Sequence, residues 1–314
     1  MANQAFPLSK LEQLPFDLRA EAIEAAIEPF RIADGNIDRR WEALTAKRRK
    51  TALRRLANRF LGGWLGSGRR DRGSIESEYT EAWSAGHQKY DPSRAEKRAQ
   101  PWLWGDRRLL LDGGAASRLR SLLFAAVIKE LKPRRVLEVG SGNGINLLML
   151  AGAFPEISFT GLELTQAGVD AARGVQAQEA LPTGLADYIP LPLQDSSAFK
   201  RITFIRGDAT AMPFEANSFD LVITVLAVEQ MERVRHKALA DIARVTKRNL
   251  LMLEPFRDVN SSSLRRLYVV SRNYFRGSIE ELKNFGMTPL WATDDFPQEA
   301  FLGSPLVLSE KRPG

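Results

Sequence analysis

Cysteine is absent from this 314-residue chain. Disulfides, thiolate metal ligands and a cysteine nucleophile are therefore excluded. The chain also lacks any uninterrupted apolar run approaching the ~20 residues that cross a bilayer, and Lys10, Glu12 and Asp17 interrupt its N-terminal apolar positions. Neither a signal peptide nor a membrane span is predicted, so we expect a cytoplasmic protein.

Positive charge is in excess but is confined to one segment. The net charge is +7, and residues 39–72 alone contain twelve Lys or Arg against Glu42 and Asp71. Apolar residues recur in this segment at helical spacing, at Leu53, Leu56, Ala57, Phe60, Leu61 and Trp64. The pattern predicts a basic amphipathic helix, followed by a glycine-rich linker over residues 62–75.

The sequence allows three kinds of binding partner for this helix. Its apolar stripe can dock on the rest of the chain or across a homodimer, as most amphipathic helices do. Alternatively, residues 39–65 contact an anionic membrane peripherally at its inner surface, with Phe60 and Trp64 inserted. Nucleic acid is less favoured, because cations on a helix attract phosphates but read no bases.

The strongest motif lies over residues 136–146, where an apolar strand runs into glycines at alternate positions. Residues 135–139 are typical of a buried parallel strand, and Gly140, Gly142 and Gly144 allow a sharp turn that a ligand can approach closely. Apolar residues at helical spacing follow, so the turn opens a helix. The motif predicts a nucleotide-binding turn.

The spacing separates two nucleotide-binding families. A dinucleotide site requires Gly or Ala at position 145, but Ile145 stands there and would crowd the contact between helix and strand. An NAD-dependent oxidoreductase is therefore kept only as an alternative. The acid and the alternating glycines from Glu138 to Gly144 resemble the first motif of class I S-adenosylmethionine-dependent methyltransferases.

Two further acids follow in the order that this resemblance implies. Glu163 ends a second apolar strand, 25 residues after Glu138, close to the ~20-residue offset of a ribose-binding acid. Asp208 and Ala209 resemble the family's Gly-Asp-Ala segment, where the acid accepts from the adenine amine. Because ligands of open α/β sheets bind at the carboxyl ends of strands, the three acids are expected to converge on one adenosyl group.

A fourth landmark, residues 218–231, resembles the family's fourth strand and the loop beyond it. By this resemblance Thr224 is expected at the cofactor site. Glu229 is the best-placed base for an acceptor that carries a proton, and its alternative role is to cap the next helix. Many members have Glu-His at this point, so Gln230 stands where an imidazole would contact substrate.

The segment before the first strand is a candidate cap. The family often uses such a segment to cover the methionine end of the cofactor and to bind substrate, which makes His87 and Tyr90 candidate substrate contacts; simple packing of the neighbouring tryptophans is the alternative. Two further candidate lids are residues 180–199, which are rich in proline, and residues 257–285.

The resemblance covers residues 115–310 and implies an α/β, Rossmann-like fold. The expected sheet is seven-stranded and mostly parallel, with its last strand antiparallel and helices on both faces. We divide the chain into a helical basic N-terminal extension with linker (1–75), a cap segment (76–114) and an S-adenosylmethionine-dependent methyltransferase domain (115–314).

The implied function is methyl transfer from S-adenosylmethionine to oxygen or nitrogen of a small-molecule, glycan or lipid-linked acceptor. Base amines are disfavoured, because the sequence after the fourth strand lacks the Pro-Pro-aromatic motif of those enzymes. Asp258 with Asn260 is too loose a pair for a divalent ion, so no metal is predicted. A non-catalytic cofactor-binding scaffold and a nucleic-acid-associated methyltransferase remain alternatives.

Overall fold

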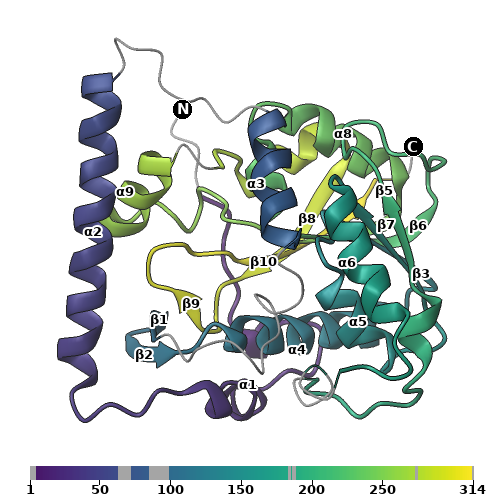
Figure 1. Cartoon of the computed structure of the whole chain (residues 1–314), viewed down its shortest axis with the longest axis horizontal. Helices are drawn as coiled ribbons and strands as arrows, with labels where there is room; N and C mark the ends of the chain where they lie inside the picture. Colours follow the sequence, from purple (N-terminus) through teal and green to yellow (C-terminus); the bar gives the residue numbers. More distant parts are fainter. Residues whose placement is uncertain are drawn as a thin grey trace.

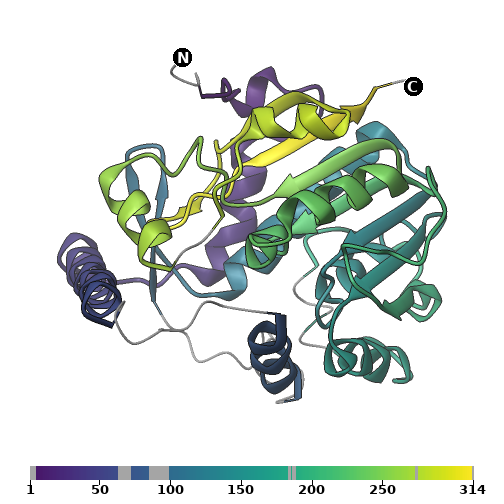
Figure 2. The ribbon, with the colours of Figure 1, turned by 90° about the horizontal axis from the view of Figure 1, so that it is seen from above.

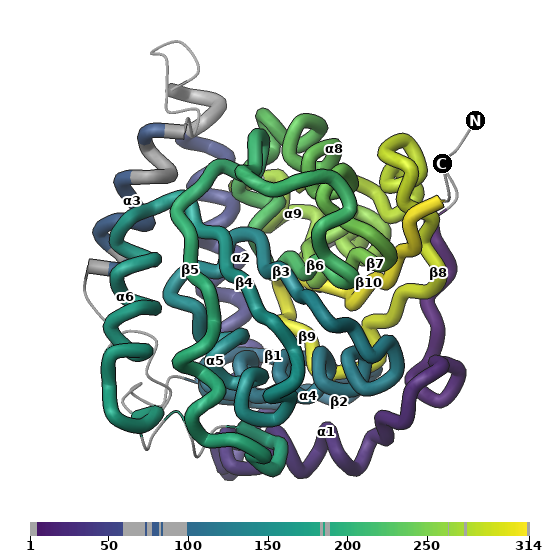
Figure 3. Tube along the Cα trace, turned by 90° about the vertical axis from the view of Figure 1, so that its right-hand side faces the viewer, coloured from purple at the N-terminus to yellow at the C-terminus, as the bar shows by residue number. Residues whose placement is uncertain are grey.

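A seven-stranded sheet forms the centre of the computed structural model, which describes residues 5–62, 72–84, 99–182, 185, 189–272 and 275–312. Its spatial order is β5-β4-β3-β6-β7-β10-β8 (Figure 3). The strands are β3 (Arg135–Val139), β4 (Ser158–Glu163), β5 (Thr203–Arg206), β6 (Phe219–Val225), β7 (Thr246–Leu253), β8 (Met287–Thr293) and β10 (Leu306–Lys311). Strands β3 to β7 pair in parallel, whereas β10 runs antiparallel to β7 and β8. The predicted fold class is confirmed.

Helices cover both faces of this sheet, as Figure 2 shows. Successive residues of a strand point to opposite faces, so Val136 and Leu137 enter two different hydrophobic cores. The core that contains Val136 is covered by α4 (Gly114–Leu131), α5 (Ile145–Ala151), α6 (Gln166–Gln176) and the 3-10 helix η4 (Ala198–Arg201). The core that contains Leu137 is covered by α8 (Arg235–Val245) and the 3-10 helix η6 (Ile279–Phe285). Burial on both faces leaves the strand ends as the place where polar side chains can gather.

The N-terminal extension folds together with the C-terminal part of the chain. Helix α1 (Ala20–Ile27), which follows η1 (Leu11–Gln13) and precedes η2 (Glu28–Phe30), buries its isoleucines in the core that contains α4. A second, antiparallel sheet joins β1 (Gln100–Trp104) to β2 (Arg107–Leu111) and β9 (Gln298–Glu299). Because β9 has two residues, hydrophobic alternation could not predict it.

The basic segment forms α2 (Ile37–Gly62), which docks on β1, β2 and α9 (Ser263–Arg272) (Figure 1). The docked face carries the buried side chains of Trp41, Thr45 and Ala52, and the indole nitrogen of Trp41 donates to the Trp102 carbonyl at 3.3 Å. Of the predicted apolar stripe, Leu53 is 49% exposed, Ala57 is exposed and Leu56 is half-buried. The side chains of Phe60, Leu61 and Trp64 lie outside the described part of the chain. Within the described residues, no helix has the length and apolar composition to span a bilayer.

Helix α3 (Arg72–Ser84) lies beside α6 (Figure 3). It begins inside the predicted linker of residues 62–75 and crosses the boundary drawn at residue 75, so the last part of that linker is helical. The 180–199 segment contributes Leu185 and Ile189 to the core. Leu193 of the same segment is exposed.

Replacing Trp41 by alanine is expected to lower the free energy of unfolding by about 3 to 5 kcal/mol, because a buried indole is removed and a cavity is left. The matched control is Leu53→Ala on the same helix, which is expected to change it by less than about 0.5 kcal/mol. Urea unfolding of both variants measures the difference. Equal losses would contradict the docked face described here.

Candidate functional site

The glycine loop between β3 and α5 passes through left-handed backbone at Gly140 (φ 75°), Gly142 (φ 55°) and Gly144 (φ 75°). A Cβ atom at Gly140 would lie 2.6 Å from the Cβ of Ala227, and one at Gly142 would lie 2.6 Å from the Trp83 ring. Both the backbone angles and the close neighbours therefore require glycine. The loop is held between the segment after β6 and helix α3.

Trp83 brings the predicted cap onto the glycine loop. Its indole stacks with the Tyr79 ring on the same helix, with 6.1 Å between ring centroids and 27° between planes. Sequence reasoning noted this tryptophan only as one of several aromatic residues and gave the functional weight to His87 and Tyr90. Those two residues lie outside the described part of the chain, and their role stays a prediction.

Glu138 is buried at 1% exposure near the end of β3. Its Oε1 accepts from the side-chain amide of Asn146 at 2.6 Å. Burial raises the pKa of Glu138 to about 7, against the opposing effects of the Asn146 hydrogen bond and the Arg120 charge. Among the described residues, neither Oε2 of Glu138 nor Oδ1 of Asn146 has a hydrogen-bond partner. The pair thus offers two buried acceptors to a ligand.

Glu163 ties the end of β4 to the glycine loop. Its Oε2 accepts from the amide of Gly142 at 3.0 Å, and its Oε1 accepts from the amide (3.0 Å) and the hydroxyl (2.8 Å) of Thr165. The structure therefore brings the first two predicted acids to the same loop. Part of the acceptor capacity of Glu163 serves to shape that loop, and the remaining lone pairs are available to a diol.

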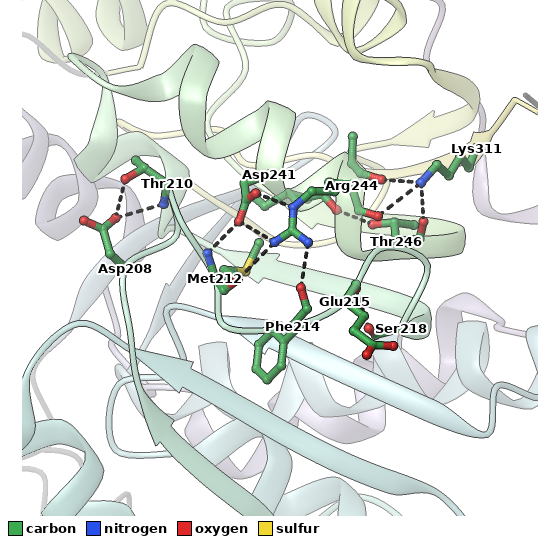
Figure 4. Close-up of polar contacts among 12 residues, drawn as sticks. Asp208, Thr210, Met212, Phe214, Glu215, Ser218, Asp241, Arg244, Thr246 and Lys311 are labelled. Atoms are coloured by element: carbon green, nitrogen blue, oxygen red, sulfur yellow. Dashed lines mark hydrogen bonds and ion pairs between the residues drawn. The ribbon is translucent and has the colours of Figure 1, made fainter.

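Asp208 lies beyond the end of β5 (Figure 4). Its Oδ1 accepts from the amide and the hydroxyl of Thr210, each at 2.8 Å. The same loop is anchored to α8, because the Met212 amide donates to Asp241 at 2.6 Å and the Arg244 guanidinium donates to the Met212 carbonyl at 3.0 Å. Asp208 and the buried Ala209 thus lie on a loop braced from outside the site.

The loop after β6 is organised by Glu254, a fully buried residue that directly follows β7. Its carboxylate accepts from the amides of Ala227 (3.0 Å), Val228 (3.1 Å) and Glu229 (3.2 Å). Burial raises the pKa of Glu254 to about 7, although these amides and the Thr224 hydroxyl lower it. Thr224, predicted at the cofactor site, is buried near this carboxylate, and its hydroxyl makes no hydrogen bond within the described residues.

Sequence reasoning assigned no role to Glu254. The signal was present, since an acid directly after an apolar strand is the same pattern that identified Glu163. Glu229 is itself buried, and its Oε1 accepts from the side-chain amide of Gln230 at 2.7 Å. The residue that replaces histidine thus contacts the predicted base.

Known proteins resemble the centre of the chain. Residues 137–252 match the family described as Methyltransferase domain. A phthiotriol/phenolphthiotriol dimycocerosates methyltransferase of Mycobacterium ulcerans is 32% identical over 118 residues, 38% of this chain and 35% of that protein. The ubiquinone/menaquinone biosynthesis C-methyltransferase UbiE of Allorhizobium ampelinum is 30% identical over 46% of this chain and 51% of its own length.

The matched region therefore spans only about a third to a half of these relatives. Among solved structures, the [4+2]-cyclase SpnF aligns with a TM-score of 0.51 at 16% identity, covering 77% of this chain and 96% of SpnF. At this identity the likeness concerns the fold alone.

The residues at the glycine loop fit the cofactor that the methyltransferase match implies. S-adenosylmethionine presents hydrogen-bond donors on its ribose, adenine and ammonium groups, and it carries positive charge. The site offers buried polar oxygens that lack partners within the described residues, at Glu138, Ser141 and Asn146. Buried acceptors of this kind are costly unless a ligand satisfies them.

The raised pKa of Glu138 predicts a pH effect on stability without cofactor. The folded pKa of about 7 lies above the ordinary 4.5, so the native state holds this proton more tightly than the unfolded state. The stabilisation is complete below pH 4.5 and is lost as pH rises through 7, by about 3 kcal/mol. Glu138→Gln, which mimics the protonated acid, should remove this part of the slope in urea unfolding between pH 5 and 8.

The matched control is Glu156→Gln, which alters an exposed glutamate after α5. The raised pKa of Glu254 also lowers the free energy of unfolding as the pH rises, and it does so in both variants. Only the difference between the slopes of the two variants is therefore diagnostic. A slope in Glu138→Gln equal to that of Glu156→Gln would contradict the buried environment of Glu138.

Proposed function

We propose that this chain, whose residues 137–252 match the family described as Methyltransferase domain, transfers a methyl group from S-adenosylmethionine to a small-molecule, glycan or lipid-linked acceptor. The transfer is to an oxygen or nitrogen atom. The names of the relatives support methyl transfer, since one is a phthiotriol/phenolphthiotriol dimycocerosates methyltransferase and the other is a methyltransferase of ubiquinone/menaquinone biosynthesis.

The proposal rests on one observation: residues at the ends of several strands contact the glycine loop. The Gly142 amide donates to Glu163 from β4, and the position of a Gly140 Cβ is blocked by Ala227 from the loop after β6. Glu229 lies two residues beyond Ala227. A cofactor-binding turn and a candidate base are thus neighbours, which is the arrangement that methyl transfer requires.

Alignment of donor and acceptor supplies most of the catalysis in this reaction. When bound, S-adenosylmethionine provides an electrophilic methyl group. Glu138 and Glu163 would hold its polar groups, and the Trp83 indole shields the glycine loop from water. For an acceptor that carries a proton, Glu229 takes that proton at a carboxylate oxygen, while Gln230 holds the carboxylate in one orientation.

Glu163→Ala is expected to weaken adenosylhomocysteine binding by about 1 to 3 kcal/mol, because hydrogen bonds to the ribose are lost. Isothermal titration calorimetry measures the change, and thermal unfolding of the free variant separates it from loss of the loop contacts to Gly142 and Thr165. The exposed Glu156→Ala is the control. Unchanged affinity in Glu163→Ala would exclude this residue from the cofactor site.

The reaction itself is tested by transfer of labelled methyl groups to aqueous and lipid extracts. Labelled product supports the proposal. Binding of adenosylhomocysteine without product in any extract would favour the non-catalytic scaffold, and binding of NADH in its place would favour the oxidoreductase.

We further propose that the exposed face of α2 contacts an anionic membrane. No acidic residue occurs between Glu42 and Asp71, and the side chains of α2 that point to solvent include Lys47, Arg49, Lys50, Arg54 and Arg55. Leu53 lies among these cations and is available for insertion. Cations flanking an exposed apolar residue are typical of helices that bind at a membrane surface.

Lys50→Glu is expected to weaken binding to vesicles of phosphatidylglycerol and phosphatidylcholine by about 2 kcal/mol, because one attracted cation becomes a repelled anion. Lys237→Glu, an equal charge change at an exposed site on α8, is the matched control. Cosedimentation at low and high salt measures both. Equal binding to pure phosphatidylcholine, or equal loss in the two variants, would exclude the α2 face as the contact.

A further inference from the structure

A cluster of arginines is built beside the cofactor site by elements outside residues 137–252. It comprises Arg48 on α2, Arg120 on α4 and Arg272 on α9, which all act on the carboxylate of Glu299 on β9. The Arg120 charge also acts on Glu138 at the end of β3. The arginine cluster therefore borders the cofactor site, yet none of its members belongs to the segment that the methyltransferase family shares.

Each arginine is held in place by its neighbours. Nη1 of Arg48 lies 3.6 Å from a carboxylate oxygen of Glu299, and its guanidinium lies 5.5 Å from the centre of the Phe301 ring. The guanidinium of Arg272 lies over the Tyr268 ring at 5.1 Å. These contacts with aromatic rings help to fix the orientation of both guanidinium groups.

Arg120 and Trp102 add buried donors to this cluster. Nη2 of Arg120 donates to the Ser117 hydroxyl at 3.0 Å, whereas its Nε is buried and has no acceptor among the described residues. The indole nitrogen of Trp102, which pairs with Glu299 across β1 and β9, likewise has none within that part of the chain. Glu138 and Asn146 thus leave oxygens without partners in the described chain, whereas Arg120 and Trp102 leave donors.

Two buried donors without partners in the described chain, Nε of Arg120 and the indole nitrogen of Trp102, therefore lie at the arginine cluster. Burial lowers the pKa of Arg120 and raises the pKa of the Glu299 and Glu138 carboxyls. Buried donors without partners are costly. A bound anion would accept from both of them.

We propose that the arginine cluster binds an anionic group, a carboxylate or a phosphate, on the methyl acceptor. This assignment rests on the proposed methyltransferase function and names the acceptor class. Guanidinium groups match both anions through paired N–H donors. The acceptor's anion would lie between α2, α4 and α9, and its methylated atom would lie toward Glu138 and the glycine loop.

The first test uses inorganic phosphate as the probe. Protein saturated with adenosylhomocysteine is titrated with phosphate at constant ionic strength, and binding is followed by calorimetry and by the thermal midpoint. Wild type should bind phosphate saturably, and Arg120→Gln and Arg272→Gln should weaken this binding about tenfold or more. Arg266→Gln, an exposed arginine on the same helix as Arg272, should bind phosphate like wild type.

Several outcomes separate this inference from the proposed function. If the wild-type protein does not bind adenosylhomocysteine, the proposed function itself is overturned. Intact cofactor binding with no saturable phosphate effect, or with equal effects in Arg272→Gln and Arg266→Gln, would overturn only the anion site. Thermal unfolding of each variant without ligand shows whether a loss reflects folding; Arg272→Lys, which keeps the charge, should then retain part of the binding.

The second test identifies the source of the anion. Aqueous and lipid extracts are each divided on an anion exchanger before transfer of labelled methyl groups. Product from a retained aqueous fraction indicates a free anionic metabolite, and product from a retained lipid fraction indicates an anionic lipid. Product confined to the unretained fractions would overturn the proposed acceptor class while supporting methyl transfer.

Discussion

The hydrogen bond from the Gly142 amide to the Glu163 carboxylate is the contact on which the arrangement of the site depends. It joins the end of β4 to a loop whose backbone is left-handed at three positions. A buried carboxylate requires donors, and Gly142 and Thr165 supply them. The loop lies with Trp83 on one side and Ala227 on the other.

A second buried carboxylate, that of Glu254, also holds a loop through backbone amides. Three consecutive amides of the loop after β6 donate to this one carboxylate, so the segment that carries Glu229 is positioned from the neighbouring strand. Glu163 and Glu254 therefore act chiefly on backbone, whereas Glu138 keeps a buried oxygen without a partner in the described chain. Acids at the ends of neighbouring strands thus differ in what they can offer a ligand.

Several elements lie outside the region that this chain shares with its relatives. The small sheet β2-β1-β9 joins the N-terminal extension to the segment between β8 and β10, and α2 packs on α9, which lies between β7 and β8. The arginine cluster arises where these parts meet. Acceptor choice can therefore differ from that of the relatives, which match only the central part of the chain.

Much of the central sheet was predictable because its strands are short apolar runs that end in glycine or an acid. The predicted strand at residues 135–139 is the observed β3, and the reversed last strand is β10. The acids Glu138 and Glu163 were identified by position, and both meet the glycine loop. The docked face of α2 was not predictable, because Trp41 and Ala52 are spaced among arginines and the more apolar Leu53 faces solvent.

The sequence alone determined the order of strands along the chain, the glycine turn and the acids at strand ends, because these depend on local spacing and side-chain chemistry. The tertiary structure decided which face of α2 is buried, that Trp83 lies over Gly142, that Glu254 organises the loop of Glu229, and that the charges of three arginines distant in the chain act on Glu299. Each of these depends on contacts between residues far apart in the chain, which no local pattern encodes.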